Sequence, residues 1–141
     1  QKLNPIDIEF RDKNVLLVDD SIVRGHTSKQ IIQMVKNCGA KKVFFASASP
    51  PVRFQNVYGI DMPATKELIA HKRTVRQIKR KIGADELIYQ DLEDLTLAAH
   101  IGNPKIKKFE DSVFTGDYCA GNVTEEFLEG LEKDRMDAMR Q

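Results

Sequence analysis

The sequence contains no tryptophan, only two cysteines, and no surplus of either charge. Cys38 and Cys119 are too few for a disulfide framework and lack metal-site spacing, so a reduced, cytoplasmic protein is expected. The 22 Lys+Arg against 21 Asp+Glu argue against a nucleic-acid-binding domain. No apolar run approaches the ~20 residues of a membrane span, and no signal-peptide pattern is present. What remains is a chain of 141 residues, enough for one domain or part of one.

Residues 14–48 carry the clearest structural pattern. Val15–Val18 is uniformly apolar, which predicts a strand buried on both faces of a parallel sheet. Thr27 or Ser28 can cap the helix that follows. Val43–Ala46 is a second apolar strand. The sequence therefore predicts one right-handed βαβ unit here.

Later parts of the chain continue the alternation of helices and strands. The expected elements are a short helix over 65–70, a helix over 75–82, a strand over 87–89, a helix capped by Asp91 whose buried side is Leu92, Leu95 and Ala99, and a final helix from Thr124. Residues 103–123 are expected to be irregular. The predicted class is α/β.

Two adjacent carboxylates, Asp19 and Asp20, follow the first strand. The carboxyl ends of parallel strands are where open α/β sheets bind ligands. Adjacent acids repel each other unless a cation or a hydroxyl-bearing group lies between them, and Mg²⁺ or a sugar diol would suit. The pair therefore predicts a metal or sugar site.

The segment Arg24–Ser28 leads from these acids into the helix. Gly25 permits backbone conformations that other residues resist, so successive N–H groups can converge on one point. The helix start adds roughly half a positive charge, and the hydroxyls of Thr27 and Ser28 add donors. An anion-binding loop beside two acids that can bind a diol or a metal is the arrangement of a ribose 5-phosphate site.

The stretch VLLVDDSIVRGHTS, residues 15–28, resembles the phosphoribosylpyrophosphate-binding motif of type I phosphoribosyltransferases. Segments spread over residues 9–118 are similar to one family among them, the amidophosphoribosyltransferases, or glutamine phosphoribosylpyrophosphate amidotransferases. These segments include GAKKVFFASASPPVRF, NVYGIDMP and IGADELIYQDLEDL. The resemblance implies part of the α/β, parallel-sheet fold of type I phosphoribosyltransferases, followed by C-terminal helices.

The resemblance also implies an activity. This family transfers glutamine-derived ammonia to 5-phosphoribosyl 1-pyrophosphate (PRPP), giving 5-phosphoribosylamine in the first step of de novo purine synthesis. The expected partners are PRPP, Mg²⁺, inhibitory purine nucleotides and further copies of the chain, with no nucleic acid or membrane. Asp19 and Asp20 would be catalytic and would hold the metal. The substrate-binding residues would be Asp19, Asp20, Ser21, Arg24, Gly25, His26, Thr27 and Ser28.

The chain also departs from the family pattern. The glutaminase domain and the upstream part of the transferase domain, with its pyrophosphate loop, are expected to be missing from this sequence. Residues 1–13 are interpreted as the tail of a flexible catalytic loop and the lead-in, 14–100 as a portion of the transferase core and 101–141 as an irregular segment with a helix. The isolated chain is therefore expected to be inactive. His26 stands where many relatives carry Thr. The iron–sulfur cluster of some members needs four cysteines, so none is expected here.

Two alternatives use the same residues. A receiver-type signalling domain would pair Asp19 and Asp20 with Asp61 as phosphoacceptor, because Asp61-Met62-Pro63 resembles the neighbourhood of such a residue. A phosphoacceptor should end an apolar strand, however, and Arg53–Gly59 is polar and loop-like. The second alternative is a non-catalytic fragment that binds nucleotide.

Overall fold

The structure is a computed structural model, and it describes residues 7–138. Residues 1–6 of the predicted lead-in lie outside the described part. In chain order the elements are α1 (Asp7–Phe10), β1 (Asn14–Asp19), α2 (His26–Asn37), β2 (Lys42–Ser47), the 3₁₀ helix η1 (Thr65–Glu67), α3 (Val75–Ile82), β3 (Glu86–Tyr89), α4 (Leu92–Gly102), α5 (Ser112–Thr115) and α6 (Glu125–Ala138).

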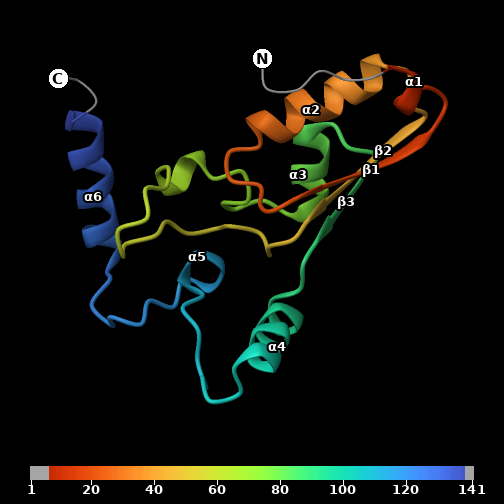
Figure 1. Cartoon of the computed structure of the whole chain (residues 1–141). Coiled ribbons are helices and arrows are strands. Elements are labelled where there is room, and N and C mark those ends of the chain that lie inside the picture. The colour runs from red at the N-terminus through yellow and green to blue at the C-terminus, as the bar shows by residue number, and fades with distance from the viewer. Residues whose placement is uncertain (1–6, 139–141) are drawn as a thin grey trace.

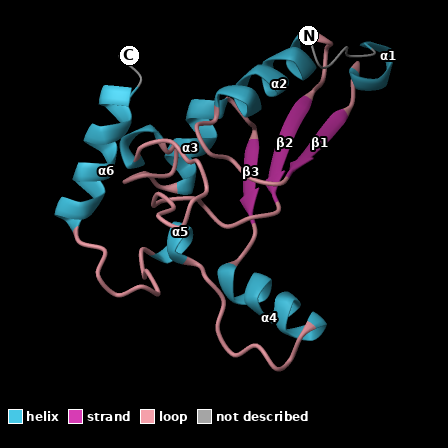
Figure 2. Cartoon of the chain, turned by 60° about the vertical axis from the view of Figure 1, so that its left-hand side comes forward, coloured by secondary structure: helices cyan, strands magenta, loops and turns pink. Residues whose placement is uncertain are grey.

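The three described strands form one parallel sheet in the order β1-β2-β3. In its register, Val15 lies opposite Val43 and Phe45 opposite Leu87. Helix α2 connects β1 to β2, so the predicted βαβ unit and the α/β class are confirmed. The carboxyl ends of all the strands lie at one edge of the sheet (Figure 2).

The core lies between this sheet and the helices α2 and α3. The helices contribute their apolar stripes, in which Val35 and Ile78 are completely buried. From the sheet, Val43 and Phe45 of β2 point into the same cluster. Because β2 is the central strand, burial of its side chains fixes the face on which both helices pack.

Strand β1 differs from the prediction that it is buried on both faces. Leu16 and Val18 are 57% and 70% exposed, whereas Val15 and Leu17 are partly buried against the core. Helices α2 and α3 pack on one side of the sheet only, so alternate side chains of β1 have no cover among the described residues. The prediction of two buried faces is therefore wrong for the described part.

Helix α4 also differs from the prediction. Asp91 caps it as expected, since its carboxylate accepts a hydrogen bond from Glu93 N at 2.8 Å. The predicted buried side is wrong, because no residue of α4 is buried. Figure 1 shows the reason: α4 projects away from the sheet and the core.

Between the main elements the chain is mostly irregular. The expected helix over 65–70 is only the 3₁₀ turn Thr65–Glu67, and 103–123 contains one short helix, α5. Residues 48–64 carry no strand, so Asp61 does not end one, and the receiver alternative lacks its phosphoacceptor position. Within residues 7–138, no helix is long and apolar enough to cross a membrane.

Tyr89 is the last residue of β3, and the surroundings of its hydroxyl group are unusual. This oxygen is buried and has no hydrogen-bond partner among the described residues. Burial raises the pKa of Tyr89 to about 12, because the phenolate loses hydration; the nearby Arg53 opposes this effect. The folded state therefore holds the phenol proton more tightly than the unfolded chain does.

Replacing Tyr89 by phenylalanine is expected to make unfolding less sensitive to alkaline pH. An unfolded tyrosine has a pKa of about 10, so its stabilising contribution is present below pH 10 and is lost as the pH rises towards 12. At pH 7 the stability should change by less than about 1 kcal/mol, since no hydrogen bond is removed. Urea unfolding of both proteins between pH 7 and 12 measures this, and equal losses of stability would contradict it.

Candidate functional site

A hollow of about 440 Å³ opens at the carboxyl end of β1, beside the start of α2. This volume is within the range of ligand pockets in proteins. Its lining consists of Asp19, Asp20, Ser21, Val23, Arg24, Gly25, His26, Thr27 and Ser28. The structure therefore brings together all eight residues expected from the sequence, and Val23 joins them. Their roles in binding stay predictions.

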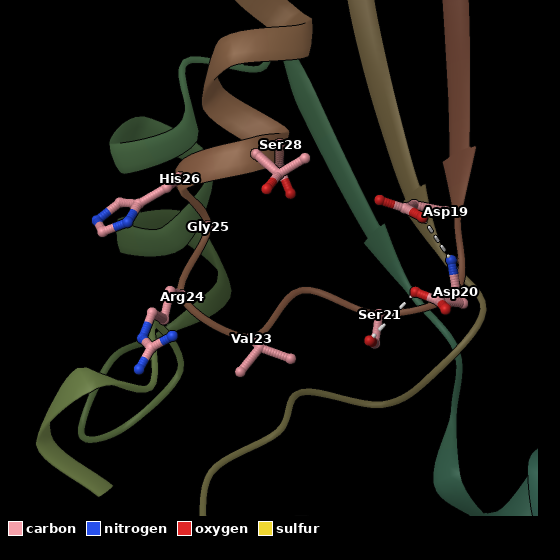
Figure 3. A pocket seen from close by; sticks show the side chains of 9 residues that line it. Asp19, Asp20, Ser21, Val23, Arg24, Gly25, His26 and Ser28 are labelled. Atoms are coloured by element: carbon pink, nitrogen blue, oxygen red, sulfur yellow. Dashed lines mark hydrogen bonds between the residues drawn. The ribbon is translucent and has the colours of Figure 1, made fainter. Parts of the chain in front are cut away.

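The two carboxylates form one side of the hollow (Figure 3). Asp19 ends β1, and its Oδ1 accepts a hydrogen bond from the backbone N of Asp20 at 3.0 Å. Ser21 Oγ donates to Asp20 Oδ1 at 3.3 Å. Among the described residues neither acid forms an ion pair with a lysine or arginine. The pair therefore presents uncompensated negative charge to the hollow.

The opposite side is formed by residues 23–28, here called the Gly25 loop. Gly25 adopts φ 76°, a left-handed conformation that side chains resist. A Cβ at this position would also overlap Cδ1 of Ile69. Glycine is therefore favoured by the backbone conformation, and a larger residue would in addition have to displace the side chain of Ile69.

The start of α2 differs from the prediction that Thr27 or Ser28 caps it. Gly25 is the N-cap and provides no side-chain hydrogen bond; the first helical bond runs from Lys29 N to Gly25 O at 3.0 Å. The left-handed glycine turns the chain directly into the helix, so Thr27 and Ser28 fall inside the first turn. The first N–H groups of α2 thus remain available to a ligand.

Arg24 and His26 line the hollow differently from the acids. The guanidinium of Arg24 is held by Glu67, with Nε donating to Oε2 at 2.7 Å. The imidazole of His26 is exposed and extends to the side of the loop away from Asp19 (Figure 3). The anion-binding capacity of the hollow therefore rests mainly on backbone N–H groups and hydroxyls.

The two carboxylates of the hollow would suit a magnesium ion that is shared with a phosphate-bearing ligand. Residues 7–138 contain no group of three or more metal-ligating side chains, so Asp19 and Asp20 are a two-carboxylate set. Mg²⁺ is typically bound by one or two carboxylates together with substrate phosphates and waters. The donor set is thus suited to a shared metal and unsuited to an all-protein cage.

Sequence reasoning missed the supports of the Gly25 loop. Glu67 and Ile69 contact it from a segment more than 40 residues further along the chain. Nothing in their local pattern indicates this contact, because it depends on how the irregular residues 48–64 fold back. The one available signal is that Ile69 belongs to a short apolar run, Leu68–Ala70, outside any long helix or strand.

Curated relatives match almost the whole chain. It is 56% identical over 140 residues to the amidophosphoribosyltransferase of Pseudomonas aeruginosa, which covers 99% of this chain and 28% of that protein. The Escherichia coli enzyme of that name is 58% identical over 137 residues, 97% of this chain and 27% of its own. The Saccharomyces cerevisiae enzyme is 51% identical, over 96% and 26%. The chain thus spans just over a quarter of the length of these relatives.

Solved structures agree with the sequence matches. One, described as the allosteric regulatory enzyme of purine biosynthesis, gives a TM-score of 0.73 at 33% identity over 90% of this chain and 28% of that one. Another, glutamine PRPP amidotransferase from B. subtilis complexed with ADP and GMP, gives 0.72 at 32% identity over 87% and 28%.

The likeness to these structures confirms the predicted fold, a partial parallel-sheet type I phosphoribosyltransferase-like fold. No model of a protein family matches the chain. The matches cover most of this chain and a limited part of each relative. In sequence and in fold, the chain is therefore similar to the amidophosphoribosyltransferases, and it matches the carboxyl-terminal part of their longer chains.

Proposed function

We propose that this chain supplies the ribose 5-phosphate site of an amidophosphoribosyltransferase. The complete enzyme would transfer glutamine-derived ammonia to PRPP and form 5-phosphoribosylamine, at the start of purine synthesis. One observation carries the proposal: an uncompensated pair of carboxylates faces the Gly25 loop across a single hollow at the carboxyl end of the sheet. The two acids can bind the hydroxyls at one end of a ribose 5-phosphate, and the loop opposite them can bind the phosphate at its other end.

The acids and the loop have different tasks in this proposal. Asp19 and Asp20 accept hydrogen bonds from the ribose hydroxyls, which fixes the sugar for attack at C1. Their negative charge also stabilises the positive charge that develops on the sugar as the pyrophosphate leaves. The N–H groups of residues 25–28 and the hydroxyls of Thr27 and Ser28 bind the 5-phosphate. Ser21, Arg24 and His26 complete the lining of the hollow.

Asp19 and Asp20 would also hold Mg²⁺ together with the substrate. The metal supplies charge neutralisation for the pyrophosphate group. Both carboxylates lack an ion-pair partner in the described part of the chain, which supports this role. The two cysteines, Cys38 and Cys119, supply too few ligands for an iron–sulfur cluster of four cysteines, and we propose none.

The proposal extends to the rest of the enzyme. Residues 1–13 would be the tail of the catalytic loop, 14–100 part of the transferase core and 101–141 a C-terminal extension, and a separate glutaminase domain would supply ammonia. Purine nucleotides would compete for the same hollow, in keeping with the ADP and GMP named for the B. subtilis relative. A homo-oligomer in the cytoplasm is the expected state, and the isolated chain is expected to lack transferase activity.

Calorimetric titration of the chain with PRPP tests the proposal. We expect saturable binding at one site, weaker binding when Mg²⁺ is removed by chelation, and competition by a purine nucleoside monophosphate. The reason is that the two acids would bind the ribose and the metal together, while the Gly25 loop would bind the 5-phosphate that PRPP and the nucleotide share. Nucleotide binding without PRPP binding would favour a non-catalytic nucleotide-binding fragment, and the absence of both would contradict the proposal.

A further inference from the structure

We propose that Glu67–Ala70, here called the brace, holds the Gly25 loop in its phosphate-binding shape, with Glu67 and Ile69 as positioning residues. The inference rests on the proposed function, because it assumes that the loop binds a phosphate monoester. It assigns a role to residues that do not line the hollow themselves. Three separate contacts support it.

Ile69 contacts the loop at two points. Its backbone N donates to the carbonyl oxygen of Val23 at 2.8 Å. Its Cδ1 occupies the space in which a side chain at Gly25 would lie. Ile69 is only 2% exposed and belongs to the hydrophobic core, so it has little freedom to move. The loop is thereby held on both sides of Arg24.

Glu67 provides the third contact. Its Oε2 accepts the hydrogen bond from Arg24 Nε at 2.7 Å, and both side chains are about half exposed. An exposed ion pair of this kind contributes little to overall stability. It does fix the direction of Arg24, the residue between the two points at which Ile69 holds the loop.

Two arginine side chains hold the brace by hydrogen bonds to its backbone. Arg53 Nη1 donates to the carbonyl oxygen of Ala70 at 2.9 Å. Arg73 Nη1 donates to the carbonyl oxygen of Ile69 at 3.1 Å. Both arginines are partly buried, and neither forms an ion pair with a carboxylate within residues 7–138. Their donors are thus used on the backbone of the brace, which stiffens a segment that has no regular secondary structure beyond Glu67.

A rigid brace matters because the loop contains a glycine. Gly25 would otherwise sample many backbone conformations, and only those in which the N–H groups converge can bind phosphate. Fixing the loop before the ligand arrives removes the cost of ordering it on binding. The brace therefore raises affinity without touching the ligand.

A matched pair of conservative variants separates this role from general stability. Ile69→Val removes the Cδ1 that contacts Gly25, and Ile78→Val makes the same change in a core residue of α3. Both are expected to lower the urea midpoint to a similar extent. Only Ile69→Val is expected to speed hydrogen exchange of the Gly25 loop amides and to weaken ribose 5-phosphate binding, by about fivefold.

The direction in which Glu67→Ala changes ribose 5-phosphate affinity shows whether Glu67 acts by positioning Arg24 or only through its own negative charge. Removing a negative charge near an anion site should strengthen phosphate binding if Glu67 acts through its charge alone. If Glu67 positions Arg24, Glu67→Ala should weaken ribose 5-phosphate binding by about threefold. Glu86→Ala is the control, because Glu86 forms a comparable ion pair with Lys79 at 3.0 Å, away from the hollow.

These outcomes are distinguishable from failure of the proposed function. If the wild-type chain does not bind ribose 5-phosphate, the proposed function fails, and exchange of the loop amides still tests the brace. If the wild-type chain binds, but Ile69→Val and Ile78→Val behave alike in exchange and affinity, the brace is overturned. Tighter binding by Glu67→Ala would overturn the role of Glu67.

Discussion

Replacing Asp19 and Asp20 together by asparagine is expected to lower 5-phosphoribosylamine formation by the complete enzyme about 100-fold or more. Asparagine keeps the size of each side chain but loses the charge that would stabilise the developing positive charge on the ribose and hold Mg²⁺. Glutamine hydrolysis should remain detectable, because a separate domain is expected to carry it out. Both rates are measured on the same preparation, so a difference in enzyme concentration would change them together.

A control for this variant lies in α4. Glu93 and Asp94 are also adjacent, exposed acids, and they lie away from the hollow. Glu93→Gln with Asp94→Asn removes the same net charge, so its transferase rate should stay near that of the wild type. Unchanged 5-phosphoribosylamine formation in the variant with both Asp19 and Asp20 replaced would contradict the assignment of these residues to the active site.

Gly25→Ala is expected to destabilise the protein by about 3 kcal/mol. A left-handed conformation costs an alanine about 1 kcal/mol. The remainder comes from forcing a methyl group against Ile69, which is buried in the core. Chemical denaturation measures the change, and ribose 5-phosphate binding should weaken as well, because the loop must shift to relieve the overlap.

Gly83 is the control position for the Gly25→Ala variant. It ends α3 with φ 80°, and a Cβ there would meet nothing within 4 Å. Gly83→Ala should therefore cost only the conformational part, about 1 kcal/mol. Combining Gly25→Ala with Ile69→Val should recover part of the difference, because the overlapping Cδ1 is then absent. Equal costs at Gly25 and Gly83 would show that the contact with Ile69 is unimportant.

Local sequence patterns were sufficient for most of the secondary structure. Helix α3 has the predicted bounds, because Thr74 and Gln77 form a capping box and Gly83 adopts the left-handed conformation at its end. Strands β1 and β2 were predicted from short apolar runs, and Asp91 was predicted as the cap of α4. Each of these signals lies within a few residues of the element that it specifies.

Burial was predicted less well, because it depends on what covers each face. Leu16 and Val18 have the composition of a buried strand, yet both are exposed, since helices pack on one side of the described sheet only. The apolar residues of α4 are not buried for a related reason: the helix lies away from the core. A hydrophobic pattern indicates that a surface needs a partner, but it does not identify the partner.

The residues that line the hollow could be predicted almost completely because they are contiguous in the sequence, and their binding roles stay predictions. One turn from the end of β1 to the start of α2 brings Asp19, Gly25 and Ser28 around one hollow. The N-cap was predicted wrongly, since Thr27 and Ser28 are common capping residues and the left-handed Gly25 replaces them. The brace could not be predicted, because Ile69 reaches the loop only through the tertiary fold.

The central claim is that one hollow binds the sugar and the phosphate of the same ligand. Nuclear magnetic resonance of the ¹⁵N-labelled chain, titrated with ribose 5-phosphate and Mg²⁺, tests it most directly. We predict that the largest amide shifts fall on residues 19–28, and that Asp19→Asn with Asp20→Asn abolishes the shifts at the acids. Shifts that cluster elsewhere, or a spectrum unchanged at saturating ligand, would contradict it.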